Sequence, residues 1–195
     1  MLRRDFITLG GTATLLAACG VETKPPYKGV DITGADYGRD FKLPDTDGRM
    51  RSVQDFAGKA VVVFFGYTQC PDACPTTLAE IAGAKKLLGA DGARVQPVLI
   101  SLDPERDQPD VLKSYATAFG PDFIALRGTP EQTAAVAKDF KVFYRKVPGS
   151  THGSYTLDHT AASYVYDPKG RLRLYVRYGS GPQALADDLR LILQG

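Results

Sequence analysis

The sequence contains no tryptophan, two histidines and three cysteines among its 195 residues. A metal site in this chain therefore has few nitrogen and sulfur ligands available. The formal net charge is only +2, and no cluster of lysine and arginine alternates with aromatic residues, so nothing supports nucleic-acid binding. Hydrophobic residues make up 44% and charged residues 24%, which is the balance of an ordinary globular domain.

The N-terminal segment lacks a hydrophobic run long enough to cross a bilayer. Residues 1–18 have a charged start followed by apolar and small residues, which predicts an export signal. The segment ends in LLAAC, which resembles a lipobox and predicts a lipoprotein lipidated at Cys19; an ordinary cleaved signal is the alternative. RRDFI resembles a twin-arginine signal. We expect a protein held by lipid at the periplasmic face of the bacterial inner membrane.

The remainder of the chain divides into a tether and one domain. Residues 19–36 are polar and contain proline and glycine, which predicts a lipidated tether. No second linker and no internal repeat follows, so residues 37–195 are expected to form a single domain. Because one cysteine is assigned to the anchor, two remain in an oxidising compartment.

Hydrophobic patterning predicts an α/β fold. The runs AVVVFFG (60–66) and VQPVLISLDP (95–104) are typical of strands buried on both faces of a sheet. Four segments show helical spacing, at residues 75–89, 107–120, 129–142 and 182–194. The positions expected to be buried on the first two are Leu78, Ile81, Leu87, Leu88, Val111, Leu112, Tyr115 and Phe119. With hairpins turning at residues 47–48 and 167–170, the expected architecture is a central mixed sheet with helices on both faces and an N-terminal β-hairpin.

Two thiols follow the first of these buried strands. In FFGYTQCPDACPTT, Cys70 and Cys74 stand on the loop and first turn of a helix predicted to begin near Pro75. The C-terminal end of a parallel strand is where such sheets place their chemistry, and a helix N-terminus favours thiolate. A spacing of four brings the sulfurs to one face, where they can close a disulfide or hold one ion. The alternative is two buried thiols, or a permanent staple that adds little stability over so short a loop.

A metal held by this pair needs a further ligand. His152 lies in a Gly/Ser-rich loop and is expected to be exposed. His159 lies just before a predicted central strand, near the strand end that carries the thiols; a core histidine with satisfied hydrogen bonds is the alternative. The neighbouring Asp158 is expected to orient its imidazole. Two thiolates and one imidazole suit copper, whereas tetrahedral zinc needs a fourth ligand, for which we find no candidate.

Three segments together resemble the Sco/SenC family: GKAVVVFFGYTQCPDACPTTLAEIA, LISLDPERDQP and DHTAASYVYDPKGRL. The likeness extends from about Phe41 to the end of the chain. It implies a thioredoxin-like fold and a membrane-anchored copper chaperone that assembles the Cu-A centre of cytochrome c oxidase subunit II. By resemblance, one copper ion, Cu(I) or Cu(II), is held by Cys70, Cys74 and His159.

The resemblance also covers two carboxylates and implies partners. Asp72, between the cysteines, and Asp103, in SLDPERD, match the family pattern, with turn and capping roles as the alternative. Some members of the family are thought to reduce the oxidase cysteines instead of delivering copper, so both functions stay open. The implied partners are subunit II of the oxidase and another periplasmic copper carrier.

A function of a different class is a thiol–disulfide oxidoreductase or peroxidase of the same fold, with Cys70 and Cys74 as the redox pair. The C-x-x-x-C spacing argues against it, and so does the lack of a proline before the strand that faces the thiols, where His159 stands instead. A structural lipoprotein with a stapled loop is a third reading. The enzyme makes His159 dispensable, whereas the chaperone makes it essential.

Overall fold

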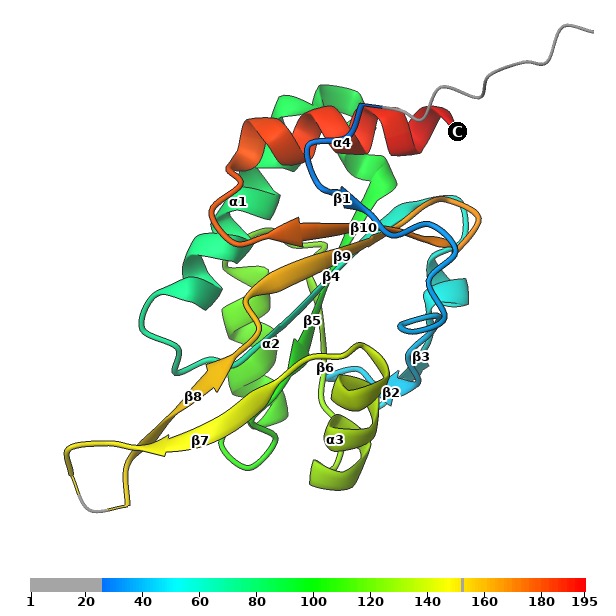
Figure 1. The fold of residues 1–195 in the computed structure, drawn as a ribbon. Helices are drawn as coiled ribbons and strands as arrows, with labels where there is room; N and C mark the ends of the chain where they lie inside the picture. Colours follow the sequence, from blue (N-terminus) through cyan, green and yellow to red (C-terminus); the bar gives the residue numbers. More distant parts are fainter. Residues whose placement is uncertain (1–25, 152) are drawn as a thin grey trace, which may run out of the picture.

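The computed structural model describes residues 26–151 and 153–195 (Figure 1). The predicted export signal, Cys19 and His152 lie outside the described residues. Within the described part of the chain, none of the helices combines the length and apolar character needed to cross a membrane.

A six-stranded mixed sheet with the order β1-β10-β9-β4-β5-β6 forms the centre of the molecule. Its strands are β1 (Val30–Asp31), β4 (Ala60–Gly66), β5 (Val95–Ser101), β6 (Ile124–Leu126), β9 (Ala162–Tyr166) and β10 (Leu172–Arg177). Every residue of β4 and β5 is buried, as predicted. Because β4 pairs in parallel with β5 but antiparallel with β9, the end of β4 lies beside the start of β9.

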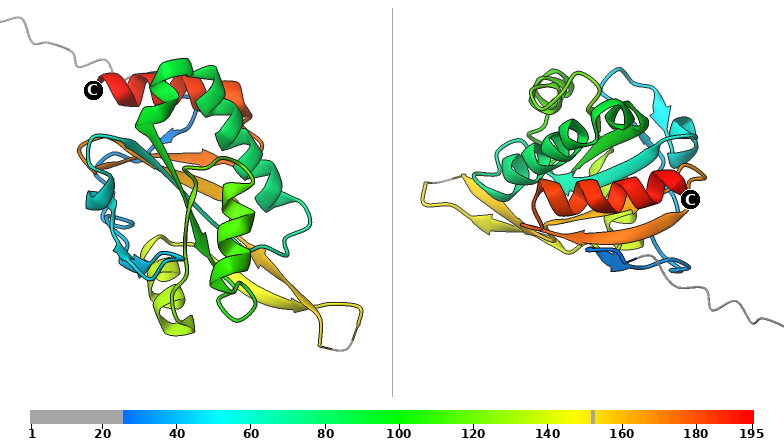
Figure 2. Two further views of the ribbon diagram at one scale, coloured as in Figure 1. Left: turned by 180° about the vertical axis from the view of Figure 1, so that it is seen from behind. Right: turned by 90° about the horizontal axis from the view of Figure 1, so that it is seen from above.

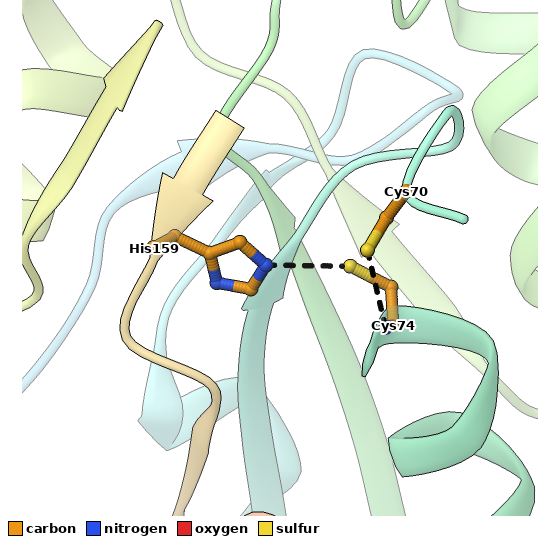
Figure 3. Close-up of side chains that lie close together, drawn as sticks. All are labelled: Cys70, Cys74 and His159. Atoms are coloured by element: carbon orange, nitrogen blue, oxygen red, sulfur yellow. Dashed lines mark hydrogen bonds between the residues drawn. The ribbon is translucent and has the colours of Figure 1, made fainter. Parts of the chain in front are cut away.

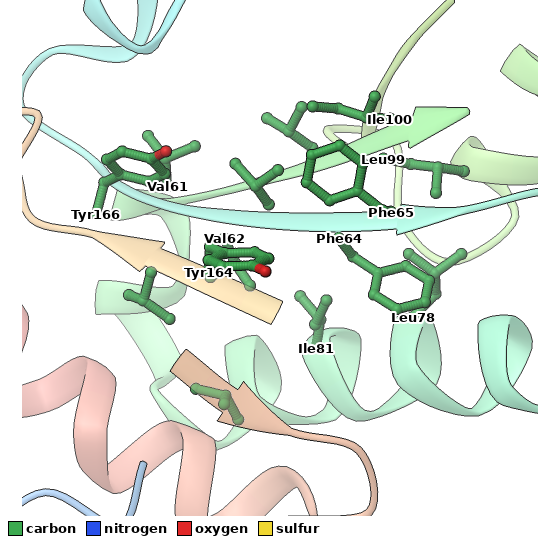
Figure 4. Close-up of a cluster of buried hydrophobic side chains, with 14 of the residues drawn as sticks. Val61, Val62, Phe64, Phe65, Leu78, Ile81, Leu99, Ile100, Tyr164 and Tyr166 are labelled. Carbon is green, nitrogen blue, oxygen red and sulfur yellow. The ribbon is translucent and has the colours of Figure 1, made fainter. Parts of the chain in front are cut away.

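Four helices cover the sheet. They are α1 (Ala73–Leu87), α2 (Pro109–Thr117), α3 (Pro130–Asp139) and α4 (Pro182–Gln194). Two short 3-10 helices, η1 (Val53–Phe56) and η2 (Gly89–Arg94), lie in the connections. Figure 2 shows α1, α2 and α4 on one face and α3 on the other. Alternate residues of β4 serve the two sides: Phe64 points toward α1 (Figure 4), whereas the ring of Phe65 lies 5.0 Å from that of Phe140, just after α3. The predicted sheet with helices on both faces is confirmed.

The described residues form three hairpins, two of which were predicted. β2 (Leu43–Pro44) and β3 (Met50–Arg51) form the N-terminal hairpin, whose turn uses Gly48 with a φ of +82°. The β9–β10 hairpin turns where expected. The third, β7 (Tyr144–Pro148) with β8 (Tyr155–His159), was missed; it projects from the body of the molecule (Figures 1 and 2).

Some predicted boundaries and buried positions are wrong. Helix α1 begins at Ala73, two residues before the predicted start near Pro75. Leu87 and Val111, expected in the core, are 44% and 53% exposed. Each stands next to a leucine that is buried instead, because adjacent residues of a helix differ by about 100° in direction and rarely share a core face.

The domain begins earlier than residue 37. Val30 in β1 pairs with Tyr175 in β10, so the C-terminal part of the predicted tether belongs to the fold. The backbone N–H groups of Lys28 and Gly29 donate to the two carboxylate oxygens of Asp188 in α4, at 2.7 and 2.8 Å. Asp188 is buried, so it fixes the point where the chain enters the domain.

We expect Asp188→Ala to lower the free energy of unfolding by about 1–3 kcal/mol, because two backbone N–H groups lose the buried carboxylate that accepts from them. Urea denaturation measures this loss. In limited proteolysis, we expect the variant to be cut near Lys28 faster than the wild type. Asp187→Ala is the matched control: this neighbouring carboxylate is 42% exposed and pairs with Arg190, so its loss should change stability by less than about 0.5 kcal/mol. Equal effects of the two variants would contradict the role given to Asp188.

Candidate metal centre

The two cysteines lie where β4 passes into α1. A Cβ added to Gly66, the last residue of β4, would stand 2.9 Å from the sulfur of Cys74, so only glycine lets the sulfur approach the strand this closely. Cys74 is fully buried in the first turn of α1. Cys70 precedes the helix, is partly exposed, and accepts a hydrogen bond at 3.4 Å from the backbone N–H of Cys74. Both thiols are free.

His159, the last residue of β8, approaches these sulfurs from a distant part of the sequence. Its Nε2 lies 3.5 Å from the sulfur of Cys74, although the two residues are 85 positions apart (Figure 3). The ligand atoms of Cys70, Cys74 and His159 all lie within 4.8 Å of one another. The structure thus brings together the three residues that the sequence singled out; that they hold a metal stays a prediction.

A backbone carbonyl orients the imidazole. Nδ1 of His159 lies 3.1 Å from the carbonyl oxygen of Thr160, which can only accept, so Nδ1 carries the proton. The lone pair of Nε2 is then directed at the sulfurs, as a metal ligand requires. The rings of Phe64 and Tyr67 stand edge-on to the imidazole, with centroids 6.1 and 5.9 Å away, and close in its sides.

Asp158 does not perform this task, so its predicted role is wrong. Successive side chains of a strand point to opposite sides, so Asp158 faces away from the sulfurs that His159 faces. Its carboxylate, 54% exposed, pairs instead with Arg145 across the hairpin at 2.9 Å. The error arose because this segment was read as the approach to a strand and not as a strand itself.

The two thiols have opposite protonation preferences. The hydrogen bond from the Cys74 thiol, followed by the backbone N–H groups of Asp72 and Cys74, lowers the pKa of Cys70 to about 4 against the opposing effect of burial. The same bond to Cys70, and then burial, raises the pKa of Cys74 above its ordinary value. At neutral pH the pair is therefore one thiolate and one thiol. The expectation that the helix N-terminus favours thiolate holds for Cys70 and fails for Cys74.

The two predicted carboxylates take different positions. Asp72 is exposed and precedes α1, but its side chain does not cap the helix. Its backbone N–H donates a hydrogen bond to the sulfur of Cys70. Asp103 is buried, pairs with Arg106 and accepts a hydrogen bond from the hydroxyl of Tyr155. It is therefore connected to the sulfurs and the imidazole only indirectly, through these residues. Neither carboxylate is a member of the group formed by the sulfurs and the imidazole.

A buried carboxylate beneath the cysteine loop was missed. Asp107 is fully buried, and its oxygens accept hydrogen bonds from the backbone and hydroxyl of Thr68 and from the hydroxyl of Ser101. Burial raises its pKa despite these bonds. Because Thr68 stands two residues before Cys70, this network fixes the start of the loop. One signal for it was present, the second aspartate in SLDPERD, to which no role was assigned.

A family model described as SCO1/SenC matches residues 30–194, which is nearly all of the described chain. The chain belongs to this family. Among SCO1/SenC relatives, a "SCO2-like protein" of Rickettsia felis is 34% identical over 92% of this chain and 89% of its own length. The mitochondrial SCO2 homolog of Bos taurus is 35% identical over 77% of this chain and 58% of its own length.

Solved structures of SCO1/SenC proteins share the fold. ScoI of Bradyrhizobium japonicum, solved with copper bound, is 39% identical, with a TM-score of 0.72 over 81% of this chain and 99% of that one. Apo Sco1 of Thermus thermophilus is 37% identical, with a TM-score of 0.75 over 85% of this chain and 96% of that one. The fold is thioredoxin-like, as predicted.

The unequal thiols predict an unusual alkylation profile. Because the pKa of Cys70 is about 4, its iodoacetamide rate should change little between about pH 6 and about pH 8. In the urea-unfolded chain, where thiols have a pKa of about 8.5, the rate should rise roughly 80-fold. Peptide mass mapping distinguishes Cys70 from Cys74, which should react only after unfolding. A folded-state Cys70 rate that climbs as in urea would contradict this assignment.

Proposed function

We propose that this SCO1/SenC protein binds one copper ion through Cys70, Cys74 and His159 and serves in assembly of the Cu-A centre of cytochrome c oxidase subunit II. The observation that carries the proposal is the convergence of two sulfurs and one imidazole nitrogen within 4.8 Å. In the part of the chain that the structure describes, this is the one cluster of three such side chains. Copper bound to ScoI of B. japonicum, which is 39% identical, supports the same choice.

The donor set fits copper. Thiolate sulfur is a soft ligand that selects Cu(I), and imidazole serves either oxidation state. The imidazole is already in the tautomer that offers Nε2 to the sulfurs. With three protein ligands, one position stays open to an incoming ligand, so a cysteine of the oxidase subunit can displace the chaperone's ligands one at a time. The two cysteines must be reduced to bind, which couples copper loading to the redox state of the pair.

Location follows from the N-terminal sequence. We place the domain at the periplasmic face of the bacterial inner membrane, held by a lipid on Cys19, with subunit II and a periplasmic copper carrier as partners. The charged start, the LLAAC segment and the polar residues after it support this placement.

A second candidate is thiol–disulfide reduction of the same oxidase subunit. One observation favours it: Cys70 is a partly exposed thiolate, the nucleophile that attacks a disulfide, and Cys74 lies directly behind it to resolve the mixed disulfide. The reduction consumes the two thiols and yields a Cys70–Cys74 disulfide, so a separate dithiol reductant must regenerate the pair. The two functions use the same sulfurs, but only copper binding needs the imidazole.

The histidine therefore separates the two functions. We expect His159→Ala to weaken copper binding by the reduced protein more than about 10-fold, which is about 1.4 kcal/mol, because one of three ligands is lost. Titration with Cu(I) and with Cu(II), followed by thiolate-to-copper absorption, measures it. The matched control is His152→Ala, which removes the other imidazole of the chain and should leave binding unchanged. Unchanged copper affinity in His159→Ala, with dithiol turnover intact, would favour the reductase.

Copper binding should also release protons in a defined ratio. At about pH 7 Cys70 is already a thiolate, so only Cys74 has a proton to lose, and we expect about one proton per copper. Calorimetric titration in two buffers with different ionisation enthalpies gives this number. Release of two protons would mean that Cys70 is protonated before binding.

A further inference from the structure

The strand that carries His159 is attached to the domain by alternate residues. Tyr155, Leu157 and His159 share the inward side of β8, because every second side chain of a strand points the same way. The backbone N–H of Leu157 donates to the hydroxyl of Tyr67 at 3.1 Å. His159 meets the sulfur of Cys74. The third inward residue, Tyr155, contacts Arg106.

Arg106 lies between the hairpin and the cysteine loop. Its guanidinium carbon stands 3.6 Å from the centre of the Tyr155 ring, and its Nη1 donates to the backbone carbonyl of Tyr155 at 2.8 Å. The same Nη1 donates at 3.1 Å to the side-chain oxygen of Gln69, the residue before Cys70. One side chain therefore touches both segments that supply the metal centre.

A buried carboxylate completes this connection. Asp103, 2% exposed, accepts from Nε of Arg106 and, through its other oxygen, from the hydroxyl of Tyr155 at 2.8 Å. Arg106 is thereby held in one orientation by a fixed anion, and a charge-assisted bond of this kind is stronger than a neutral one. The three residues form a closed polar cluster beside the first residue of β8, at the turn end of the hairpin, which we call the Arg106 cluster (Asp103, Arg106, Tyr155).

The β7–β8 hairpin depends on such attachments. It is a two-stranded ribbon outside the six-stranded sheet, and an isolated ribbon of this kind is marginally stable in water. The pairing of β9 with β4 holds the chain just after His159, and the contacts of the inward side of β8 hold the chain just before it.

We propose that Arg106 is a positioning residue that fastens β8 to the cysteine loop and thereby holds His159 beside Cys70 and Cys74 before any metal arrives. The proposal deepens the copper site and rests on the proposed function in assigning His159 as a ligand. Holding the imidazole in place removes an ordering cost from metal binding.

Arginine is required here by its shape. A planar guanidinium offers several N–H donors in fixed directions and a flat face for an aromatic ring, whereas lysine offers one compact ammonium. Arg106→Lys keeps the positive charge near the Cys70 thiolate but cannot bond Asp103, Gln69 and the Tyr155 carbonyl while covering the ring. The lysine variant therefore separates a positioning role from a purely electrostatic one.

The first measurement needs no copper. In the metal-free reduced protein, Arg106→Gln and Arg106→Lys should both accelerate hydrogen exchange of the Leu157 amide, about 10-fold, because that end of β8 detaches more often. Arg145→Gln is the matched control, since it removes an arginine of the same hairpin whose partner, Asp158, lies on the outward side. Tyr155→Phe is a milder variant that keeps the ring and loses only the bond to Asp103, and it should give a smaller acceleration.

The second measurement is a double-mutant cycle on copper affinity. Arg106→Gln should weaken copper binding about 10-fold in the wild-type background, the size typical of residues that orient ligands. In the His159→Ala background it should have no further effect, because no imidazole remains to be positioned. Equal losses in both backgrounds would overturn the proposal, as would rescue by lysine or unchanged exchange at Leu157.

Failure of the copper function would look different. If the wild type bound no copper, or if His159→Ala bound it as tightly as the wild type, the proposed function would fall while the exchange experiment still tested the attachment. If His159→Ala lost copper and the Arg106 variants did not, only the positioning role would fall.

Discussion

The antiparallel pairing of β9 with β4 is the constraint on which the metal centre depends. In this register Phe64 faces Ser163, so the segment before β9 must pass the point where β4 ends and the cysteine loop begins. An imidazole at residue 159 is thereby delivered to sulfurs at residues 70 and 74. The helix that follows the loop buries one sulfur and leaves the other near the surface, which gives the pair its unequal chemistry.

This inequality links the two chemistries that the site can support. A lone buried thiolate would be costly, and two adjacent thiolates would repel each other, so the pair holds one proton between two neighbouring sulfurs. Cys70, the more exposed sulfur, is placed to attack a disulfide or to bind a metal ion. Cys74, the buried sulfur, is placed to complete either reaction. The two proposed functions, copper binding and disulfide exchange, would thus begin from the same resting state, and only copper binding would use the imidazole.

The sequence predicted the sheet, its helices and the three clustered residues, because buried strands and a two-cysteine loop leave strong local patterns. It failed where the answer depended on three-dimensional packing. Asp158 was predicted to orient the imidazole, as the Thr160 carbonyl does, because residues 155–159 were not recognised as a strand, in which neighbouring side chains point to opposite sides. The raised pKa of Cys74 comes from its hydrogen bond to Cys70 and then from burial, and Arg106 gains its importance only when Tyr155 is folded against it; neither contact is visible in a linear reading.

The hydrogen bonds from Lys28 and Gly29 to Asp188 fix the end of the domain at which the chain enters. The chain enters beside α4, at the end of the molecule away from the cysteine loop, and all three ribbon views agree on this separation (Figures 1 and 2). In the proposed lipid-anchored state, the sulfurs and the imidazole would lie at the end of the domain opposite to the one where the chain enters. Each residue between an N-terminal anchor and the domain adds at most about 3.6 Å of reach. To contact a recipient in the same membrane, the domain would therefore have to tilt, or the recipient would have to extend away from the membrane surface.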